Sequence, residues 1–126
     1  VVHWKSTAAV RAERKSIIER FEALDPADAR GWLTLAEVLS EDRGTAEIAL
    51  DVLQVWLRDV QVAQLPDAKL VNGDLQPLAV AAASKVSPAG LHRRNLLIDE
   101  ARNAITQRNG AIRIQLERMF VEMFAG

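Results

Sequence analysis

Apolar residues recur at spacings of three and four along almost the whole chain, which places them on one face of an α-helix. No segment alternates apolar and polar residues as a half-buried strand does. The pattern predicts six helices, at about residues 7–24, 29–40, 45–65, 75–86, 88–108 and 111–124. The connections are short, so we expect an all-α compact bundle of five to six helices, forming a single domain over residues 1–126.

Residues that start and stop helices support these boundaries. We expect Asp28 to cap the second helix, Asp74 the fourth, and Ser87-Pro88 the fifth, because a side-chain oxygen at a helix start accepts a backbone N–H and proline fits the first turn. The third helix is expected to open at Thr45. Asn72-Gly73 is a common hairpin turn, but no alternating strand flanks it, so a hairpin is rejected.

The third helix is predicted to be the centre of the bundle, because apolar residues cover about two-thirds of its circumference and need neighbours on several sides. Its polar side chains follow one narrow stripe, formed by Glu47, Asp51, Gln54, Arg58 and Gln61. Asp59 does not lie on this stripe. Helical spacing places it on a face expected to be dry, among Ile48, Val52, Val55 and Val62.

A buried carboxylate either becomes neutral or finds a donor. We expect Asp59 to meet Arg94 or Arg102 of the fifth helix, or to accept hydrogen bonds from backbone N–H groups of a helix start or loop. A catalytic acid or base is the alternative, because perturbed carboxylates beside arginine occur in active sites. Catalysis needs a second group and a cavity, and no second carboxylate or histidine converges here, so a structural role is favoured.

Composition limits the chemistry available. The 126 residues include no cysteine, and the two histidines, His3 and His92, are too far apart to suggest a local metal motif, so no metal and no cofactor are expected. Absence of cysteine suits a reducing, cytoplasmic setting, and no apolar run is long enough for a membrane span. The sequence starts at Val1 with neither methionine nor a signal peptide, so we expect a fragment of a longer protein.

Charge is unevenly distributed, although the net charge is only -1. The stretch from Glu19 to Asp59 contains ten acidic and four basic residues, and the stretch from Lys85 to Arg118 contains seven basic and three acidic residues. Such a division favours an oriented contact with a partner over non-specific attraction to a polyanion.

Four residues of the central helix, Trp56-Leu57-Arg58-Asp59, carry a resemblance to a known family. With the loop Leu70–Leu75 they resemble the C-terminal domain of the delta-prime subunit of the bacterial DNA polymerase III clamp loader. Softer matches follow at Ile98, Ala101-Arg102, Ile105, Asn109 and Leu116-Glu117. The likeness spans about residues 28–124, although the family often has proline where Gly73 stands. The gamma/tau collar domain is a related alternative, against which the WLRD sequence argues.

The resemblance implies a collar domain, a helical bundle that joins its equivalents on the gamma/tau and delta subunits in a pentameric ring. It implies a non-catalytic assembly role in DNA replication, with no direct nucleic-acid contact and no small-molecule substrate. The collar would follow an AAA+ module, and no GxxxxGK[ST] phosphate-binding loop occurs in this sequence. We expect Trp56 to anchor the core, Asp59 to fix helix register and Asn109 to cap the last helix.

The sixth helix offers a candidate partner surface. Its inward face is predicted to consist of Ile112, Leu116, Met119, Phe120 and Met123. Ile114 and Val121 lie on roughly the opposite side, either as ordinary scattered apolar residues or as a contact with another subunit. The pairs Arg113/Glu117 and Arg118/Glu122 are expected to form a solvated face.

The sequence gives less support to three other functions. The segment Arg93–Asp99 resembles the R…LID pattern of helical chorismate mutases, but no converging site supports an enzyme. Direct DNA binding through residues 85–118 is disfavoured because the arginines are dispersed around two helices and do not line one face. A tetratricopeptide-like adaptor would require an internal repeat, and none is found.

Overall fold

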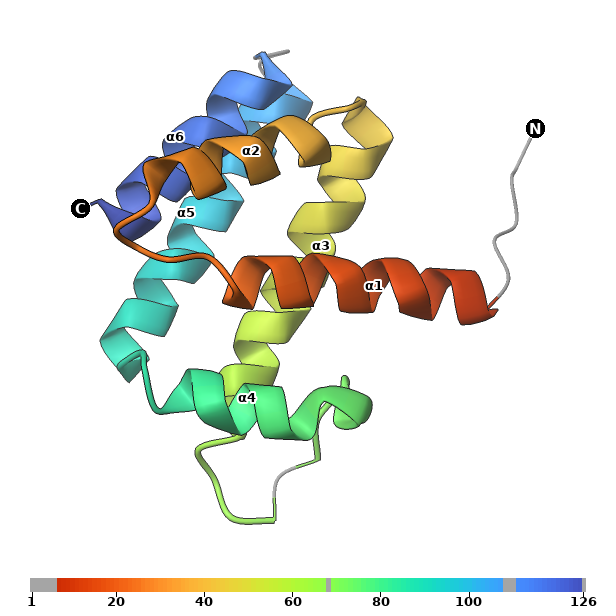
Figure 1. Ribbon diagram of the computed structural model, residues 1–126, viewed down its shortest axis with the longest axis vertical. Helices are drawn as coiled ribbons and strands as arrows, with labels where there is room; N and C mark the ends of the chain where they lie inside the picture. Colours follow the sequence, from red (N-terminus) through yellow and green to blue (C-terminus); the bar gives the residue numbers. More distant parts are fainter. Residues whose placement is uncertain (1–6, 68, 108–110, 126) are drawn as a thin grey trace.

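The structure, a computed structural model, describes residues 7–67, 69–107 and 111–125. In chain order the elements are α1 (Thr7–Glu22), α2 (Ala29–Leu39), α3 (Arg43–Val62), a short 3₁₀ helix η1 (Gly73–Leu75), α4 (Gln76–Ala83), α5 (Pro88–Gln107) and α6 (Ile112–Phe124) (Figure 1). No strand occurs within these described ranges. The prediction of an all-α bundle with six α-helices is therefore confirmed.

Two of the predicted helix caps are confirmed. The Asp28 carboxylate accepts a hydrogen bond from the Gly31 N–H at the start of α2. The Ser87 hydroxyl accepts one from the Gly90 N–H at 3.0 Å, with Pro88 as the first residue of α5. Both side chains satisfy a donor that the first turn of a helix leaves without a helical acceptor.

Two other predicted starts are wrong. The third helix begins at Arg43, before the predicted Thr45, because the Asp42 carboxylate accepts the Thr45 N–H at 2.7 Å and acts as the cap. Asp74 does not cap α4, which begins after Leu75 without a side-chain cap. The chain first makes η1, and the Asp74 carboxylate instead pairs with Arg14 of α1 at 3.2 Å.

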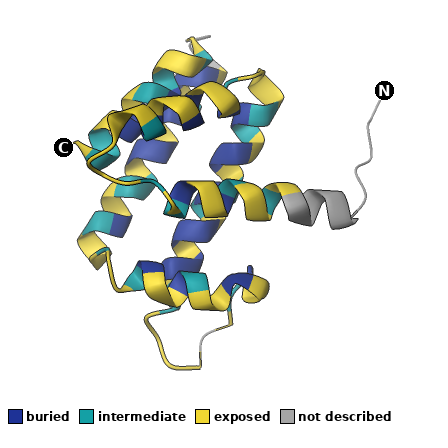
Figure 2. Ribbon diagram, viewed as in Figure 1, coloured by how far each residue is buried: buried dark blue, intermediate teal, exposed yellow. Residues whose placement is uncertain are grey.

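α3 is the centre of the bundle, as predicted. It packs against α5, α1, α4 and α2, while α6 covers α2 and α5. Figure 1 shows α1 crossing α3 near its middle and α4 crossing it near its C-terminal end, and Figure 2 shows buried positions along much of α3. The buried residues of this helix are Ala46, Ala49, Leu50, Leu53, Trp56, Leu57, Asp59 and Val60.

The remaining core comes from the apolar faces of the surrounding helices. On α2 the predicted face is fully confirmed, with Trp32, Leu35, Ala36 and Leu39 all buried. One expectation about α3 fails: Ile48 and Val55 are exposed, at 49% and 39%, so the face that holds Asp59 is not dry along its whole length. The described helices leave that side of α3 partly open at these two positions, which helical periodicity alone does not reveal.

A candidate site at the end of the central helix

Asp59 lies near the end of α3 and is buried, with 2% of its surface exposed. Its carboxylate accepts three hydrogen bonds, from the Val71 N–H at 2.8 Å, the Asn72 N–H at 2.8 Å and the Asn72 side-chain amide at 2.6 Å. The loop between α3 and α4 therefore folds back over the carboxylate. This confirms the second of the two predicted arrangements, in which loop backbone N–H groups are the donors.

The network continues from Asn72 to α1. The Asn72 side-chain oxygen accepts a hydrogen bond from the Arg14 guanidinium, which also contacts the Asp74 carboxylate at 3.2 and 3.3 Å. Asn72 is itself buried, so both ends of its amide are used within the protein. One connected set of polar groups thus ties α1, the end of α3 and the start of η1 together.

The charge of Arg14 also acts on Asp74. Burial on its own would raise the pKa of the Asp74 carboxyl, but the hydrogen bond and the positive charge of Arg14 outweigh it and hold the pKa below the ordinary value of 3.8. The effect is modest, because the Asp74 side chain is half exposed and water screens the interaction.

The predicted arginine partners of Asp59 are wrong. Arg102 pairs instead with Asp51, on the polar stripe of α3, at 2.9 Å. Its Nη2 atom is not aligned for a hydrogen bond, so the contact is an ion pair only. α5 therefore meets α3 on the side that carries Asp51, and Asp59 points towards the loop.

Arg94 lies against an aromatic cluster. Its guanidinium carbon is 5.8 Å from the centre of the Phe21 ring and 5.2 Å from that of Phe124, within the range of cation–π contacts. Burial lowers the pKa of Arg94, and the nearby charge of Glu22 partly opposes this. The rings of Trp32 and Phe124 lie 5.6 Å apart and are tilted by 31°, so Arg94 lies beside an aromatic cluster that joins α1, α2 and α6.

The other residues of the WLRD motif divide between core and surface. Trp56 and Leu57 are buried, and the Trp56 indole N–H donates to the Glu22 carboxylate at 2.8 Å. Arg58 is exposed, as expected for a residue of the polar stripe. Asn109, predicted to cap the last helix, lies outside the described residues.

On α6 the predicted outer residues are exposed. Ile114 and Val121 have 60% and 43% of their surface accessible. The Arg113–Glu117 and Arg118–Glu122 pairs form at 3.3 and 3.1 Å, both at the surface as predicted.

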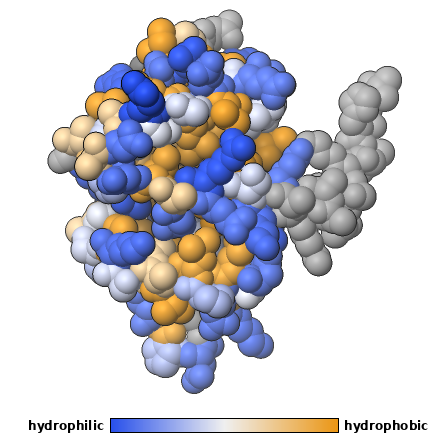
Figure 3. Space-filling model, viewed as in Figure 1, coloured by the Kyte–Doolittle hydropathy of each residue, from blue (hydrophilic) through white to orange (hydrophobic). Residues whose placement is uncertain are grey.

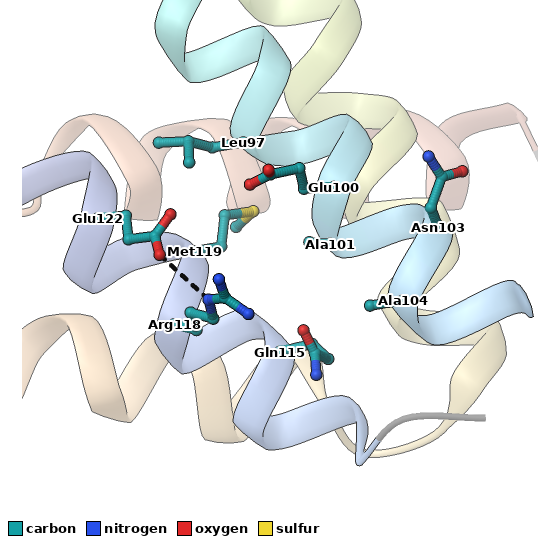
Figure 4. Close-up of a pocket in the computed structure, with 9 residues that line it drawn as sticks. All are labelled: Leu97, Glu100, Ala101, Asn103, Ala104, Gln115, Arg118, Met119 and Glu122. Carbon is teal, nitrogen blue, oxygen red and sulfur yellow. Dashed lines mark hydrogen bonds and ion pairs between the residues drawn. The ribbon is translucent and has the colours of Figure 1, made fainter. Parts of the chain in front are cut away.

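Three surface hollows are candidates for a binding site. Figure 4 shows the first, a polar groove of about 190 Å³ where Ala101 and Ala104 of α5 face Met119 of α6, with the Arg118–Glu122 pair at its edge. A second, more apolar groove of about 330 Å³ lies between α1, α2 and the start of α3. A third hollow of about 190 Å³ lies beside the loop that follows α3.

The Asp59 carboxylate lines none of these three hollows. Its bonds to Val71 and Asn72 engage both of its oxygens, so the geometry suits an anchor for the loop better than a proton-transfer group. In the described part of the chain, no group of three or more potential metal-ligating side chains is placed to hold an ion. Among the helices described, none combines the length and apolar character needed to cross a membrane.

Sequence reasoning misses Arg14 and Asn72 as members of the network. The signal available at Asn72 is its place next to Gly73, which indicates turn chemistry and not a buried contact. Arg14 gives no signal, because it stands 58 residues from Asn72 in the chain.

A family model matches most of the sequence. Its description is "DNA polymerase III, delta subunit, C terminal", and it covers residues 10–120, which includes the whole Asp59 network and most of α6. No curated protein and no solved structure gives a significant match.

Proposed function

Since the chain belongs to the family of C-terminal domains of the DNA polymerase III delta subunit, we propose that it is the collar domain of a clamp-loader protein, and that this protein is the delta-prime subunit. The match over residues 10–120 carries the proposal, because it takes in nearly all of the helical bundle and is not limited to one motif. The domain holds its subunit beside gamma/tau and delta in the pentameric ring that loads the sliding clamp.

The role is assembly without chemistry of its own. The buried Asp59 carboxylate is occupied by three hydrogen bonds, which supports a structural duty for this residue. Nucleotide binding and work on the clamp belong to an AAA+ module elsewhere in the subunit. The domain makes no direct contact with DNA and uses no cofactor or small-molecule substrate.

The choice of delta-prime over gamma/tau and delta rests on the WLRD sequence and the loop that follows it. A physical link between the two supports this choice, since the Asp59 of WLRD holds the backbone of Val71 and Asn72 in the loop. The motif and the loop form one unit, so their joint resemblance to delta-prime weighs more than either alone.

Reconstitution tests this function. The chain is mixed with gamma/tau and delta subunits and the products are sized by light scattering after size exclusion. We expect a complex that persists at moderate salt. A folded chain that joins neither subunit under conditions where the native complex assembles would contradict the collar assignment.

Chorismate mutase is the second candidate, and the structure gives it little support. Arg94 lies on aromatic rings, and Asp99 accepts a hydrogen bond from Gln54 at 2.6 Å, so these two groups do not converge on one cavity. A chorismate mutase activity assay on the same preparation decides between the two, and any turnover above background would favour the enzyme.

A further inference from the structure

Asn72 and Gly73 form an Asn-Gly pair, the dipeptide in which the thermolabile asparagine side chain deamidates most readily. The backbone nitrogen of the second residue attacks the side-chain carbonyl carbon of asparagine, and glycine hinders this approach least because it has no Cβ. The side-chain nitrogen leaves as ammonia, taking up the proton of the attacking N–H through water, and a cyclic succinimide forms. Water then opens the ring at either carbonyl carbon, which gives aspartate or isoaspartate. The net reaction is hydrolysis of one amide to a carboxylate and ammonia.

The fold itself does not require glycine at position 73. Gly73 is the first residue of η1 and its φ is not positive, so its backbone suits any residue with a Cβ. A Cβ added there would meet no other atom within 4 Å. The reactivity of the pair can therefore be changed by Gly73→Ala without changing the fold.

The folded protein holds the Asn72 side chain at both ends. Its amide nitrogen donates to Asp59 at 2.6 Å, and its oxygen accepts a hydrogen bond from Arg14. Ring closure turns the side chain onto the Gly73 nitrogen, so both of these bonds have to break first. Arg14 also polarises the amide carbonyl, but polarisation helps only when the nitrogen can reach the carbon. With 1% of its surface exposed, Asn72 is also shielded from the water that the second step consumes.

The residues on either side of Asn72 are open to solvent. Val71 has 63% of its surface exposed, and Gly73 is exposed as well. Between α1 and the start of α4, Figure 3 shows mainly hydrophilic surface, so water lies close to the amide once the loop moves away. Local opening of a loop costs less free energy than unfolding of the whole domain. The loop between α3 and α4 is therefore the place where the amide first becomes free to react.

We infer that Asn72 is a deamidation site, which its hydrogen bonds with Asp59 and Arg14 keep unreactive until the loop between α3 and α4 opens. The inference is independent of the proposed function, because it concerns the chemistry of this loop alone. It gives the polar network a second role besides holding the loop, namely protection of a reactive amide.

The product cannot restore the network. Aspartate at position 72 has no amide N–H to donate, and its carboxylate would face that of Asp59, an arrangement that like charges disfavour. Arg14 offsets only part of this repulsion, because it also pairs with Asp74. Isoaspartate extends the backbone by one carbon just before η1, which moves the neighbouring N–H groups away from Asp59. Deamidation thus turns a reversible opening of the loop into a permanent loss of its anchor.

Peptide mapping by mass spectrometry follows the reaction at mildly alkaline pH, in the folded chain and in urea. Asn109-Gly110 is the same dipeptide, so its rate in urea is a reference within the same chain. In urea we expect the two asparagines to react at rates within about twofold of each other, and Asn72 to react at least about tenfold more slowly in the folded chain than in urea.

Two variants release the amide while the protein is folded, as circular dichroism melts confirm. Arg14→Met removes one partner but keeps much of the side-chain volume, and Asp59→Asn weakens the other. Each should speed deamidation of Asn72 in the folded chain by about threefold or more and leave the rate in urea unchanged. If Asp59→Asn does not fold, Arg14→Met carries the comparison. Asp51→Ala, which breaks a partly exposed ion pair, is the control and should stay within about twofold of the parent chain.

Two substitutions in the dipeptide complete the test. Gly73→Ala should slow the reaction in urea by about tenfold, because its Cβ hinders the attack, and should melt as the parent chain does. Asn72→Asp reproduces one product and should unfold at lower urea than the parent chain near neutral pH. This difference should shrink in acid, where a protonated carboxyl at position 72 can donate to Asp59 again. Arg14 and Asp74 are present in both proteins, so their own pH dependence largely cancels in the comparison.

Any of three outcomes overturns the inference. Asn72 deamidates as fast in the folded chain as in urea; or Arg14→Met reacts no faster than Asp51→Ala; or Asn72→Asp has the urea midpoint of the parent chain at neutral pH. None of these measurements involves another clamp-loader subunit, so the proposed function stands or fails separately.

Discussion

Replacing Asp59 by alanine removes the acceptor for three hydrogen bonds at once. The backbone N–H and side-chain amide of Asn72 are left in a buried setting, whereas the Val71 N–H is closer to solvent. The loop between α3 and α4 loses the group that fixes it to the central helix. We expect Asp59→Ala to fold less stably and to loosen this loop first.

The magnitude follows from the donors left behind. An unpaired buried donor costs about 1–3 kcal/mol, so the two donors of Asn72 alone account for roughly 2–6 kcal/mol. The Val71 donor adds less because water can replace the carboxylate there, and water entering the space left by the side chain recovers part of the loss. We expect the free energy of unfolding to fall by about 3–5 kcal/mol, a large share of the roughly 5–15 kcal/mol typical of a domain.

Urea unfolding followed by circular dichroism measures this change, and hydrogen exchange locates it. The midpoint should fall without a large change in slope. The amides of Val71 and Asn72 should lose protection before those of the α3 core. Asp51→Ala is the matched control, since Asp51 is on the same helix but its side chain is 68% exposed, and its ion pair with the half-buried Arg102 should contribute about 1 kcal/mol or less.

Two results would refute the reasoning. One is an Asp59→Ala variant with the same stability as Asp51→Ala, which would mean that the buried donors find other partners at no cost. The other concerns coupling with Asn72. In a double-mutant cycle Asp59→Ala and Asn72→Ala should together cost at least about 1 kcal/mol less than the sum of the two single changes, and simple additivity would argue against a shared network.

Three further variants test other contacts. Because Arg14 lowers the pKa of Asp74, their pairing stabilises the fold at higher pH, and this stabilisation is lost as the pH falls through the lowered pKa. Asp74→Asn should remove this pH dependence, which amounts to less than about 1 kcal/mol in the free energy of unfolding between about pH 5 and 2 and can be followed by melting temperatures. Ser87→Ala removes the cap on the Gly90 N–H and should cost about 1 kcal/mol in urea unfolding. Arg94→Ala should cost about 1–2 kcal/mol and alter near-ultraviolet circular dichroism, because two aromatic rings lose their cation.

Local chemistry explains what could be predicted. The apolar stripe of α2 and the caps Asp28 and Ser87 depend on residues three or four apart, and the structure agrees with each of them. The start of α3 is harder to place because Asp42 and Thr45 both have capping side chains, and only the actual backbone path decides which one accepts and which one donates. The prediction for Asp74 is wrong because a partner distant in sequence, Arg14, takes its carboxylate.

Part of the candidate site could be predicted from the sequence. The charge of Asp59 within an apolar helix is enough to indicate a buried carboxylate with donors, and loop N–H groups are among the expected ones. The choice between these and the arginines of α5 is beyond sequence reasoning, because it depends on how α5 is rotated against α3. That rotation brings Arg102 to Asp51 and leaves Asp59 facing the loop.

The exposed apolar residues likewise include some whose exposure the sequence predicts and some whose exposure it does not. Exposure of Ile114 and Val121 follows from helical spacing, because the opposite face of α6 is apolar enough to be the buried one. Exposure of Ile48 does not, since apolar residues cover about two-thirds of the circumference of α3 and its sequence does not say which part of that surface lacks a neighbour. The groove that Ile48 lines becomes visible only when α1 and α2 are placed beside it.

α1 contributes both to the polar network around Asp59 and to the groove between α1, α2 and α3. Its Arg14 belongs to the network around Asp59, and its Ile17, one turn later, lines the groove between α1, α2 and α3. A variant that loosens the network is therefore expected to disturb this groove as well, by moving α1. Ile48 lies about 16 Å along α3 from Asp59, so a charge placed there disturbs the groove and leaves the network intact. Equal unfolding free energies for Ile48→Glu and the parent chain would therefore show that the groove can be changed without loosening the network.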